Sequence, residues 1–327
     1  SEGQNPWDVA AGAFWANRAF KKLGDTTSAR ASLVIASQYP KTFYGILASV
    51  ELGNPIVSDQ KYPVSVRRDI DEILHIPAVT RSIALLEVGM IKEAESEIRS
   101  IFLQSPPEIR TKLLSLVREM KIPGLEIRIA SILSSEKSSD FDFSLYPIPP
   151  WKPKDGFSVN PALLLAFARH ESGFNPLAKS HVGAKGLMQL MPKTATYIAH
   201  KNNLQISSNS LYDPEVSFTI GQDYLEYLIL NKEINGNLLY VAASYNAGPN
   251  TLSRWLKTIK HNEDPLLFIE SIPSKETRLF VKRIMSNYWI YREILGYNTK
   301  SVYSILDGKW PMYIYEQQNQ PKKEKVA

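Results

Sequence analysis

Hydrophobic residues recur three and four positions apart along the first 135 residues, and Gly or Pro interrupts the pattern at short intervals. This spacing places the apolar side chains on one face of an α-helix. The pattern therefore predicts a series of short helices that stop at Gly or Pro and turn back on one another. We expect these helices at 7–23, 27–38, 41–52, 78–88, 91–104, 107–120 and 124–133.

The segment 81–95 resembles one half of a tetratricopeptide-type helix pair. Gly89 stands at its turn, and Glu93-Ala94 begin the next helix. The repeat is too irregular for copies to be counted, so we interpret the region as an irregular α-solenoid or superhelix. A non-repetitive helical bundle fits the same pattern and stays open as an alternative. Neither the solenoid nor the bundle by itself indicates a catalytic or binding residue.

The composition changes after residue 133. Polar residues fill 134–140, and four prolines fall between Tyr146 and Pro153. Stiff, Pro-rich segments of this kind mark a domain boundary. We therefore predict a helical superhelix domain over 1–140 and a second domain over 141–316. The last residues, 317–327, lack an apolar period and are predicted to be a flexible tail.

The second domain opens with a strong helix signal. Asn160 is a good N-cap, Pro161 suits the first helical position, and Gly173 is the expected stop. Glu171 then falls in the last turn, at the negative end of the helix dipole and on the face that carries Phe167. Both surroundings disfavour a carboxylate and raise its pKa, as a general acid requires.

A structural role for Glu171 is the alternative. By position alone, the side chain could be exposed at a helix end and paired with Arg169 or Lys179.

Further motifs follow in order. Glu171-Ser-Gly-Phe-Asn-Pro is followed by Gly186-Leu-Met-Gln-Leu-Met-Pro, then by Ala243-Ser-Tyr-Asn-Ala-Gly-Pro and Ile269-Glu-Ser-Ile-Pro. Met188, Gln189 and Met191 combine soft apolar surface with one amide, which suits a sugar that carries an N-acetyl group.

These four strings, in this order and spacing, resemble the catalytic domain of soluble lytic transglycosylases, enzymes of the bacterial cell wall. The resemblance covers roughly residues 146–315. It implies an all-α protein: a lysozyme-like C-terminal domain behind an α-superhelical domain such as large periplasmic members of the family carry.

The resemblance also assigns roles to residues. Glu171 matches the single catalytic acid/base, and the other matched positions line or face the sugar-binding cleft. We expect substrate binding from Ser180, Met188, Gln189, Met191, Tyr245, Asn246 and Glu270. Two positions depart from the pattern, because His170 stands where Gln is common and Ser244 replaces a small apolar residue.

Two of these residues have structural alternatives. Tyr245 could cap a turn with its hydroxyl. Glu270 could belong to a helix lead-in with Ser274 as N-cap, so we expect substrate or structural support from it rather than proton transfer.

The mechanism implied by the resemblance uses one carboxyl group, whereas a conventional glycosidase uses two. Glu171 would protonate the bond that leaves C1 of N-acetylmuramic acid, and the C6 hydroxyl would then close a 1,6-anhydro ring. A lysozyme-like hydrolase and an inactive cell-wall binding scaffold are the alternatives.

The amino-acid composition argues against several classes of protein and of binding site. A net charge of +5 without basic tails argues against nucleic acid, and no apolar stretch is long enough to span a membrane. There is no cysteine, and the five histidines show no metal-ligand spacing, so we expect no metal and no cofactor. The expected partners are peptidoglycan glycan strands, with other cell-wall enzymes as candidates, and the expected location is the periplasm. The chain begins without Met or an apolar leader, which suggests a processed or shortened form.

Overall fold

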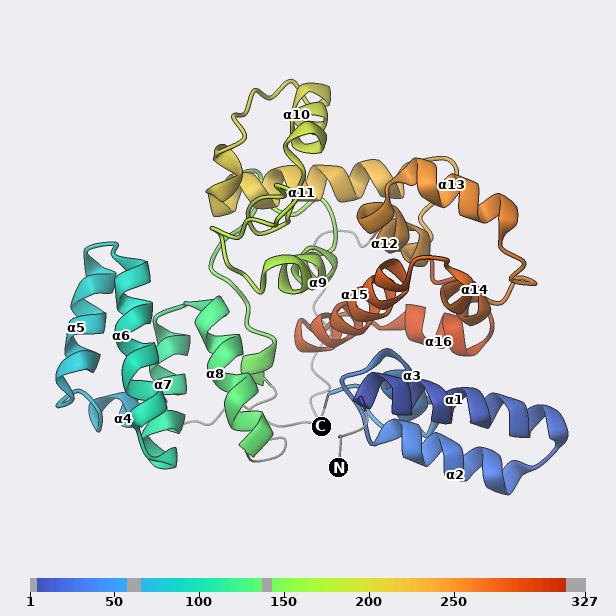
Figure 1. Ribbon diagram of the computed structural model, residues 1–327, viewed down its shortest axis with the longest axis horizontal. Helices are drawn as coiled ribbons and strands as arrows, with labels where there is room; N and C mark the ends of the chain where they lie inside the picture. The colour runs from blue at the N-terminus through green and yellow to red at the C-terminus, as the bar shows by residue number, and fades with distance from the viewer. Residues whose placement is uncertain (1–4, 58–65, 137–142, 316–327) are drawn as a thin grey trace, which may run out of the picture. The chain divides into compact units, whose positions relative to one another are not determined.

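The computed structural model describes residues 5–57, 66–136 and 143–315. Their regular structure is helical (Figure 1), and β-pairing within these ranges is limited to isolated bridges. The all-α fold class is therefore confirmed. The predicted tail, 317–327, lies outside the described residues.

The described residues form two compact units. Among the described residues, the larger unit contains 5–57, 152–171 and 178–315, and the smaller contains 66–136, 143–151 and 172–177. This division differs from the predicted one at residue 140, because the first three helices pack with the C-terminal part of the chain. The stacked rings of Phe43 and Trp289, 5.1 Å apart, are one such contact.

In the larger unit the helices are α1 (Pro6–Leu23), α2 (Thr26–Ser37), α3 (Phe43–Glu51), α9 (Pro161–Ser172), α10 (Pro192–Lys201), η2 (Ser210–Tyr212), α11 (Pro214–Ile229), α12 (Leu238–Ala247), α13 (Pro249–Thr258), α14 (Pro265–Ser271), α15 (Lys275–Ile294) and α16 (Lys300–Leu306). In the smaller unit they are α4 (Val66–Asp71), α5 (Pro77–Glu87), α6 (Ile91–Gln104), α7 (Pro107–Glu119), α8 (Pro123–Glu136) and η1 (Phe143–Leu145). Every helix expected in the first 135 residues is present to within a few residues.

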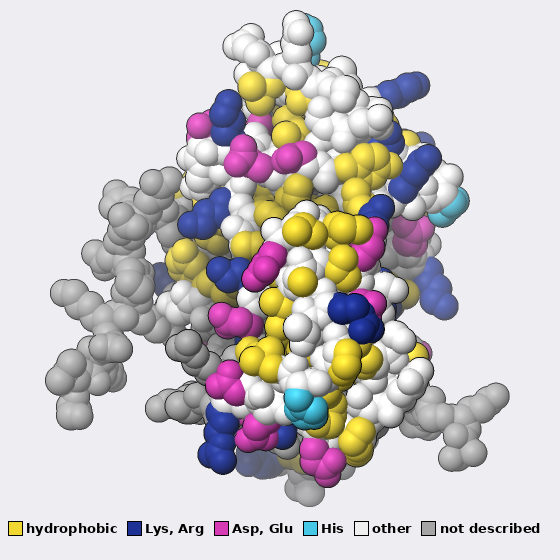
Figure 2. Space-filling model, turned by 90° about the vertical axis from the view of Figure 1, so that its left-hand side faces the viewer, with side chains coloured by type: hydrophobic (Ala, Val, Ile, Leu, Met, Phe, Trp, Pro, Cys, Tyr) yellow, Lys and Arg dark blue, Asp and Glu magenta, His cyan; other side chains and the backbone are white. Residues whose placement is uncertain are grey.

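The smaller unit is a stack of short helices, in which α5 packs on α6, α6 on α7, and α7 on α8. Its buried side chains follow the three-and-four spacing, as Ile98 and Phe102 of α6 and Leu113 and Val117 of α7 illustrate. Figure 2 shows one face of the molecule, on which hydrophobic side chains lie at the surface among acidic and basic ones.

The core of the larger unit surrounds α9 and α15. Residues 162–168 of α9 are buried on every face. Such a helix reads as continuously apolar in sequence because no side of it meets water. In α15, Trp289 and Tyr291 are fully buried.

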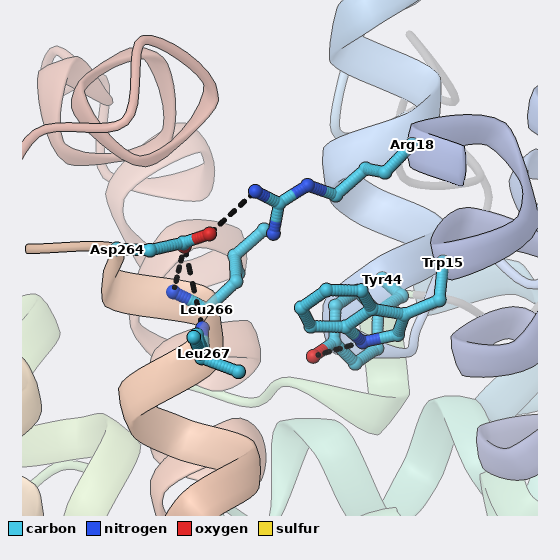
Figure 3. A network of polar contacts seen from close by, with 6 residues as sticks. All are labelled: Trp15, Arg18, Tyr44, Asp264, Leu266 and Leu267. Atoms are coloured by element: carbon cyan, nitrogen blue, oxygen red, sulfur yellow. Dashed lines mark hydrogen bonds and ion pairs between the residues drawn. The ribbon is translucent and has the colours of Figure 1, made fainter. Parts of the chain in front are cut away.

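Polar contacts attach the first helices to the rest of the larger unit (Figure 3). Arg18 Nη2 donates to Asp264 Oδ2 at 2.5 Å, and Asp264 also accepts from the backbone N–H groups that open α14. The indole of Trp15 donates to the hydroxyl of Tyr44 at 3.0 Å. The first contact joins α1 to the start of α14, and the second joins α1 to α3, so residues 5–57 are part of the framework that carries the site.

Candidate active site

Glu171 is positioned by the end of α9. Asn160 Oδ1 accepts from the backbone N–H of Ala162 at 2.9 Å, and Pro161 occupies the first turn. Gly173 leaves the helix with a φ of 57°, a conformation that favours glycine. The buried part of α9 ends at Ala168, so Glu171 emerges one turn later, at the margin of the core.

The surroundings of Glu171 favour its acid form. Burial, and in second place the negative charge of Glu276, raise the pKa of the Glu171 carboxyl to about 8. Neither Arg169 nor Lys179 contributes to this shift, and Arg169 donates to Asn287 Oδ1 at 3.1 Å. The upward direction of this pKa shift agrees with the prediction, and burial is one of the two causes that the sequence suggests.

His170 adds no charge beside the acid at neutral pH. Burial, and then the positive charges of Arg283 and Arg169, lower its pKa to about 4. Its ring meets the edge of Phe280, with ring centroids 4.9 Å apart. The residue that departs from the family pattern is therefore a neutral packing residue next to Glu171.

Tyr245 lies in the last turn of α12 and faces the same site. Its hydroxyl donates to the backbone carbonyl of Met188 at 2.7 Å, and its ring lies 4.5 Å from that of Phe167. Burial first, and then the charge of Glu171, raise the pKa of Tyr245 well above its ordinary value. The phenolic proton is thus used by the backbone, and the oxygen keeps a lone pair that can accept a hydrogen bond.

The loop before α10 is shaped by its own hydrogen bonds. Ser180 Oγ accepts from the backbone N–H of Ala184 at 3.0 Å. Gln189, in the left-handed region at a φ of 44°, donates through Nε2 to the carbonyls of Ala178 and Gly186. No described residue donates to Gln189 Oε1, so this oxygen can accept from an N–H of a ligand.

Gly186 shows why this loop needs a glycine. Its φ is 75°, and a Cβ there would lie 1.9 Å from the carbonyl oxygen of Leu211. Any side chain would separate the loop from the segment that precedes α11.

The two methionines of this loop have different surroundings. Met188 is fully buried, and its side chain occupies the space that a Cβ at Gly221 of α11 would need. It supports the loop from behind and presents no surface to a ligand, which corrects its predicted placement in a binding wall. Met191, in contrast, is 43% exposed.

Asn246 is held by the start of α15. Its Nδ2 donates to Glu276 Oε1 at 3.1 Å, and its Oδ1 accepts from Thr277 Oγ1 at 2.6 Å. The Ser274 hydroxyl caps this helix by accepting from the backbone N–H of Thr277. Both ends of the Asn246 amide are therefore engaged by protein.

Glu270 lies in a different environment. It accepts from the hydroxyl of Tyr44 at 2.6 Å and from Lys282 Nζ at 3.0 Å. These contacts connect α14 with α3 and α15, and they correspond to the structural support that the sequence leaves open for this residue.

The acidic neighbour that sequence reasoning missed is Glu276. The available signal was a Ser274-Lys-Glu-Thr string directly after Ile-Pro, which reads as an ordinary capped helix start. Tyr224 was also missed; its ring lies 5.1 Å from that of Tyr245.

No group of three or more His, Cys, Asp or Glu side chains able to hold a metal occurs in 5–57, 66–136 and 143–315. Across the same ranges, no helix has both the length and the apolar character needed to cross a membrane.

Residues 151–268 match the family model described as the transglycosylase SLT domain. The soluble lytic murein transglycosylase of Escherichia coli (strain K12) is 38% identical over 143 residues, which make up 43% of this chain and 22% of that protein. A putative soluble lytic murein transglycosylase of Haemophilus influenzae is 35% identical over 139 residues, 42% of this chain and 23% of that protein. The matched segment is thus less than a quarter of the length of these relatives.

Two solved structures share the fold. The crystal structure of the 70 kDa soluble lytic transglycosylase SLT70 from Escherichia coli superposes with a TM-score of 0.76 at 23% identity, over 95% of this chain and 50% of that chain. The lytic transglycosylase Slt from Pseudomonas aeruginosa, solved as an inactive mutant, superposes with a TM-score of 0.69 at 23% identity, over 94% and 48%.

Proposed function

We propose, on the premise that residues 151–268 belong to the transglycosylase SLT domain family, that this chain is a peptidoglycan lytic transglycosylase. The proposed substrate bond is the β-1,4 linkage between N-acetylmuramic acid and N-acetylglucosamine. The proposed acid/base is Glu171.

The observation that carries the proposal is the environment of the Glu171 carboxyl at the end of α9. Burial and the nearby Glu276 charge raise its pKa to about 8, which favours the acid form at pH 7. An ordinary glutamic acid would be almost fully ionised there and would have no proton to donate. A glycosidic oxygen is a poor leaving group until it is protonated, so a neutral carboxyl at the site supplies what the cleavage first requires.

The proposed reaction returns Glu171 to its starting state. Glu171 protonates the glycosidic oxygen as its bond to C1 of the muramic acid breaks, and the 2-acetamido oxygen of that sugar stabilises the developing positive charge. The resulting carboxylate takes the proton of the C6 hydroxyl, and O6 bonds to C1. The products are a 1,6-anhydromuramic acid end and a free N-acetylglucosamine hydroxyl, and no water is consumed.

Other residues would bind the glycan. Gln189 Oε1 is free to accept from a substrate N–H, and the exposed Met191 offers apolar contact beside it. Tyr245 would act as a hydrogen-bond acceptor, since its own proton is bonded to Met188. Ser180 shapes the loop through its bond to Ala184.

A hydrolase is the second candidate, and Glu276 is the observation that favours it. A second carboxylate near the acid is what a conventional glycosidase mechanism uses to activate water or to form a covalent intermediate. Here that carboxylate accepts a hydrogen bond from Asn246.

Product masses separate the two candidates. Purified peptidoglycan sacculi are digested, and the released muropeptides are weighed by mass spectrometry. The proposal expects muropeptides that end in an anhydro sugar, lighter by one water molecule than hydrolysis products. Hydrolysis masses alone would replace the transglycosylase with a hydrolase, and no release at all would leave the scaffold alternative.

The location and partners follow from the substrate. Peptidoglycan lies outside the cytoplasm, so we place the activity in the periplasm. Other cell-wall enzymes stay a prediction as protein partners.

A further inference from the structure

We infer that the outer face of α10 is a second contact surface for the peptidoglycan strand, where the Tyr197 ring packs against a sugar and Lys193 and Lys201 pair with carboxylates of the stem peptides. The inference rests on the proposed function for the identity of this ligand. The surface itself lies wholly within the larger unit, and it begins at the loop that carries Gln189.

A groove runs along one side of α10. The helix packs on α11 (Figure 1), and its buried side chains are Ala195, Ile198 and Ala199. The side chains between these positions point elsewhere, because helical neighbours recur three and four residues apart. They border an open groove of about 750 Å³. The residues that line this groove are Pro192, Lys193, Thr196, Tyr197, His200 and Lys201.

The groove follows directly on the loop of the candidate active site. Met191, which is 43% exposed, is the N-cap of α10, and Pro192 is both the first residue of the helix and part of the groove. Gln189 stands two residues earlier. An α-helix rises 1.5 Å per residue, so the ten residues of α10 extend this surface by about 15 Å beyond the loop. A linear strand that is held at the loop can therefore continue along α10.

Tyr197 presents an aromatic ring outside the core. The residue is 55% exposed, and its ring stands edge-on to Tyr227 of α11, with centroids 5.9 Å apart and an angle of 78°. Tyr227 stacks at 15° on Tyr224, whose ring lies 5.1 Å from Tyr245. The C–H face of a sugar ring packs well on an exposed aromatic ring, and a ring that its neighbours already hold loses little freedom on binding.

The same face carries positive charge. Lys193 and Lys201 lie in the first and last turns of α10, and both are exposed. No ion pair within 5–57, 66–136 and 143–315 involves either of them. The Lys201 ammonium lies 4.4 Å from the ring centre of Tyr227, a cation–π contact that keeps it near Tyr197. A ligand that matches both features carries sugars and carboxylates on one chain, as peptidoglycan with its stem peptides does.

The test measures binding to purified peptidoglycan sacculi. All variants carry Glu171→Gln, so that the strands are not cut during the experiment. Protein is mixed with sacculi and sedimented, and the bound fraction at a series of sacculus concentrations gives the Kd. The variants are Tyr197→Ala and the double substitution Lys193→Ala with Lys201→Ala. Circular dichroism checks that each is folded.

The larger unit offers matched controls on other surfaces. Tyr303 of α16 is 56% exposed, so Tyr303→Ala removes a tyrosine of the same exposure as Tyr197. The double substitution Lys232→Ala with Lys300→Ala removes the same amount of positive charge, and both of these lysines are exposed. The controls should bind sacculi as the Glu171→Gln parent does.

Both variants of the α10 surface should bind more weakly than the parent. Tyr197→Ala should raise the Kd about threefold to tenfold. The double lysine variant should raise it about threefold or more at ~0.05 M salt and by less at ~0.5 M, because exposed charges are screened. On sacculi whose carboxylates have been converted to neutral amides, the effect of the lysines should disappear and that of Tyr197 should stay.

Unchanged binding in either variant would overturn the inference. Equally tight binding of poly-L-glutamate, which carries carboxylates but no sugar, would also overturn it, since the surface would then bind anions in general. If wild-type protein releases no muropeptides while Tyr197→Ala and the double lysine variant still bind sacculi more weakly, the proposed function fails and the binding surface stands. If anhydro muropeptides are released and neither variant changes the Kd, the proposed function stands and this inference fails.

Discussion

The ends of α9 and α14 carry the same local sequence feature in opposite surroundings. Glu171 and Glu270 are each the penultimate residue of their helix, and each is followed by Ser. Glu171 lies one turn after the buried apolar run of α9, with a second negative charge nearby. Glu270 accepts from the Tyr44 hydroxyl and pairs with Lys282. A carboxyl group without partners is suited to carry a proton, whereas one with a cation and a hydroxyl is suited to hold helices together.

The largest difference should appear in activity. Glu171→Gln removes the proton donor and should reduce muropeptide release by about 10²–10⁴-fold, the usual contribution of a general acid. Glu270→Gln should keep kcat/KM within about threefold, because the residue touches Tyr44 and Lys282 and not the site. Initial rates on sacculi measure both variants, with circular dichroism to check that each is folded.

Comparable losses of activity in Glu171→Gln and Glu270→Gln would contradict the different roles assigned to the two glutamates. They would return Glu270 to the substrate-binding role that the sequence predicts for it.

Tyr245 tests how closely the acid depends on its neighbours. Tyr245→Phe keeps the ring contacts but loses the hydrogen bond to Met188 and the oxygen that faces Glu171. We expect kcat/KM to fall about tenfold and stability to fall by about 1 kcal/mol, the usual net value of one hydrogen bond. Tyr240→Phe is a matched control, because Tyr240 packs on Phe268 and Trp310.

The pH dependence of the free energy of unfolding should also differ between variants of the two glutamates. The folded-state pKa of Glu171, about 8, lies above its ordinary value of 4.5. Between these two pH values the folded chain binds more protons than the unfolded chain, so this group lowers the free energy of unfolding as pH rises. Glu171→Gln should therefore be more stable than wild type by about 1–3 kcal/mol near pH 8, and the difference should vanish near pH 4.

Urea unfolding at a series of pH values measures this difference. Glu270→Gln should instead be less stable than wild type by about 1–3 kcal/mol at neutral pH, because the buried Lys282 ammonium then faces a neutral amide and loses its ion-pair partner. A wild-type protein that is more stable than Glu171→Gln at every pH would contradict the proposed burial of an unpaired acid.

Local signals in the sequence were sufficient to predict where most helices begin and end. Asn160, Pro161 and Gly173 delimit α9 as predicted, because caps and stops act through the nearest few residues. The position of Glu171 at the end of an apolar face follows from helical periodicity alone. The missed helix α4, Val66–Asp71, is only six residues long, and so short a segment shows too few apolar repeats to be recognised.

Contacts between residues far apart in the chain could not be predicted from local sequence patterns. Glu270 and Tyr44 are separated by 226 positions, and nothing near either residue indicates that they meet. The same holds for Arg18 and Asp264, which assign the first helices to the larger unit and not to a domain that ends at 140. Met188 appeared as one of two equivalent methionines until the packing of α11 buried it and left Met191 exposed.

The sequence by itself determined the all-α fold class, the ends of most helices, and Glu171 as the candidate acid, because periodicity, caps and short motifs are local properties of the chain. Only the tertiary structure decided which carboxylate stands beside that acid. Glu276, at the start of α15, is the charge that acts on Glu171, whereas Glu270 is occupied by partners from α3 and α15. Whether a carboxyl group holds a proton depends on burial and on neighbouring charge, and both are set by residues far away in the chain.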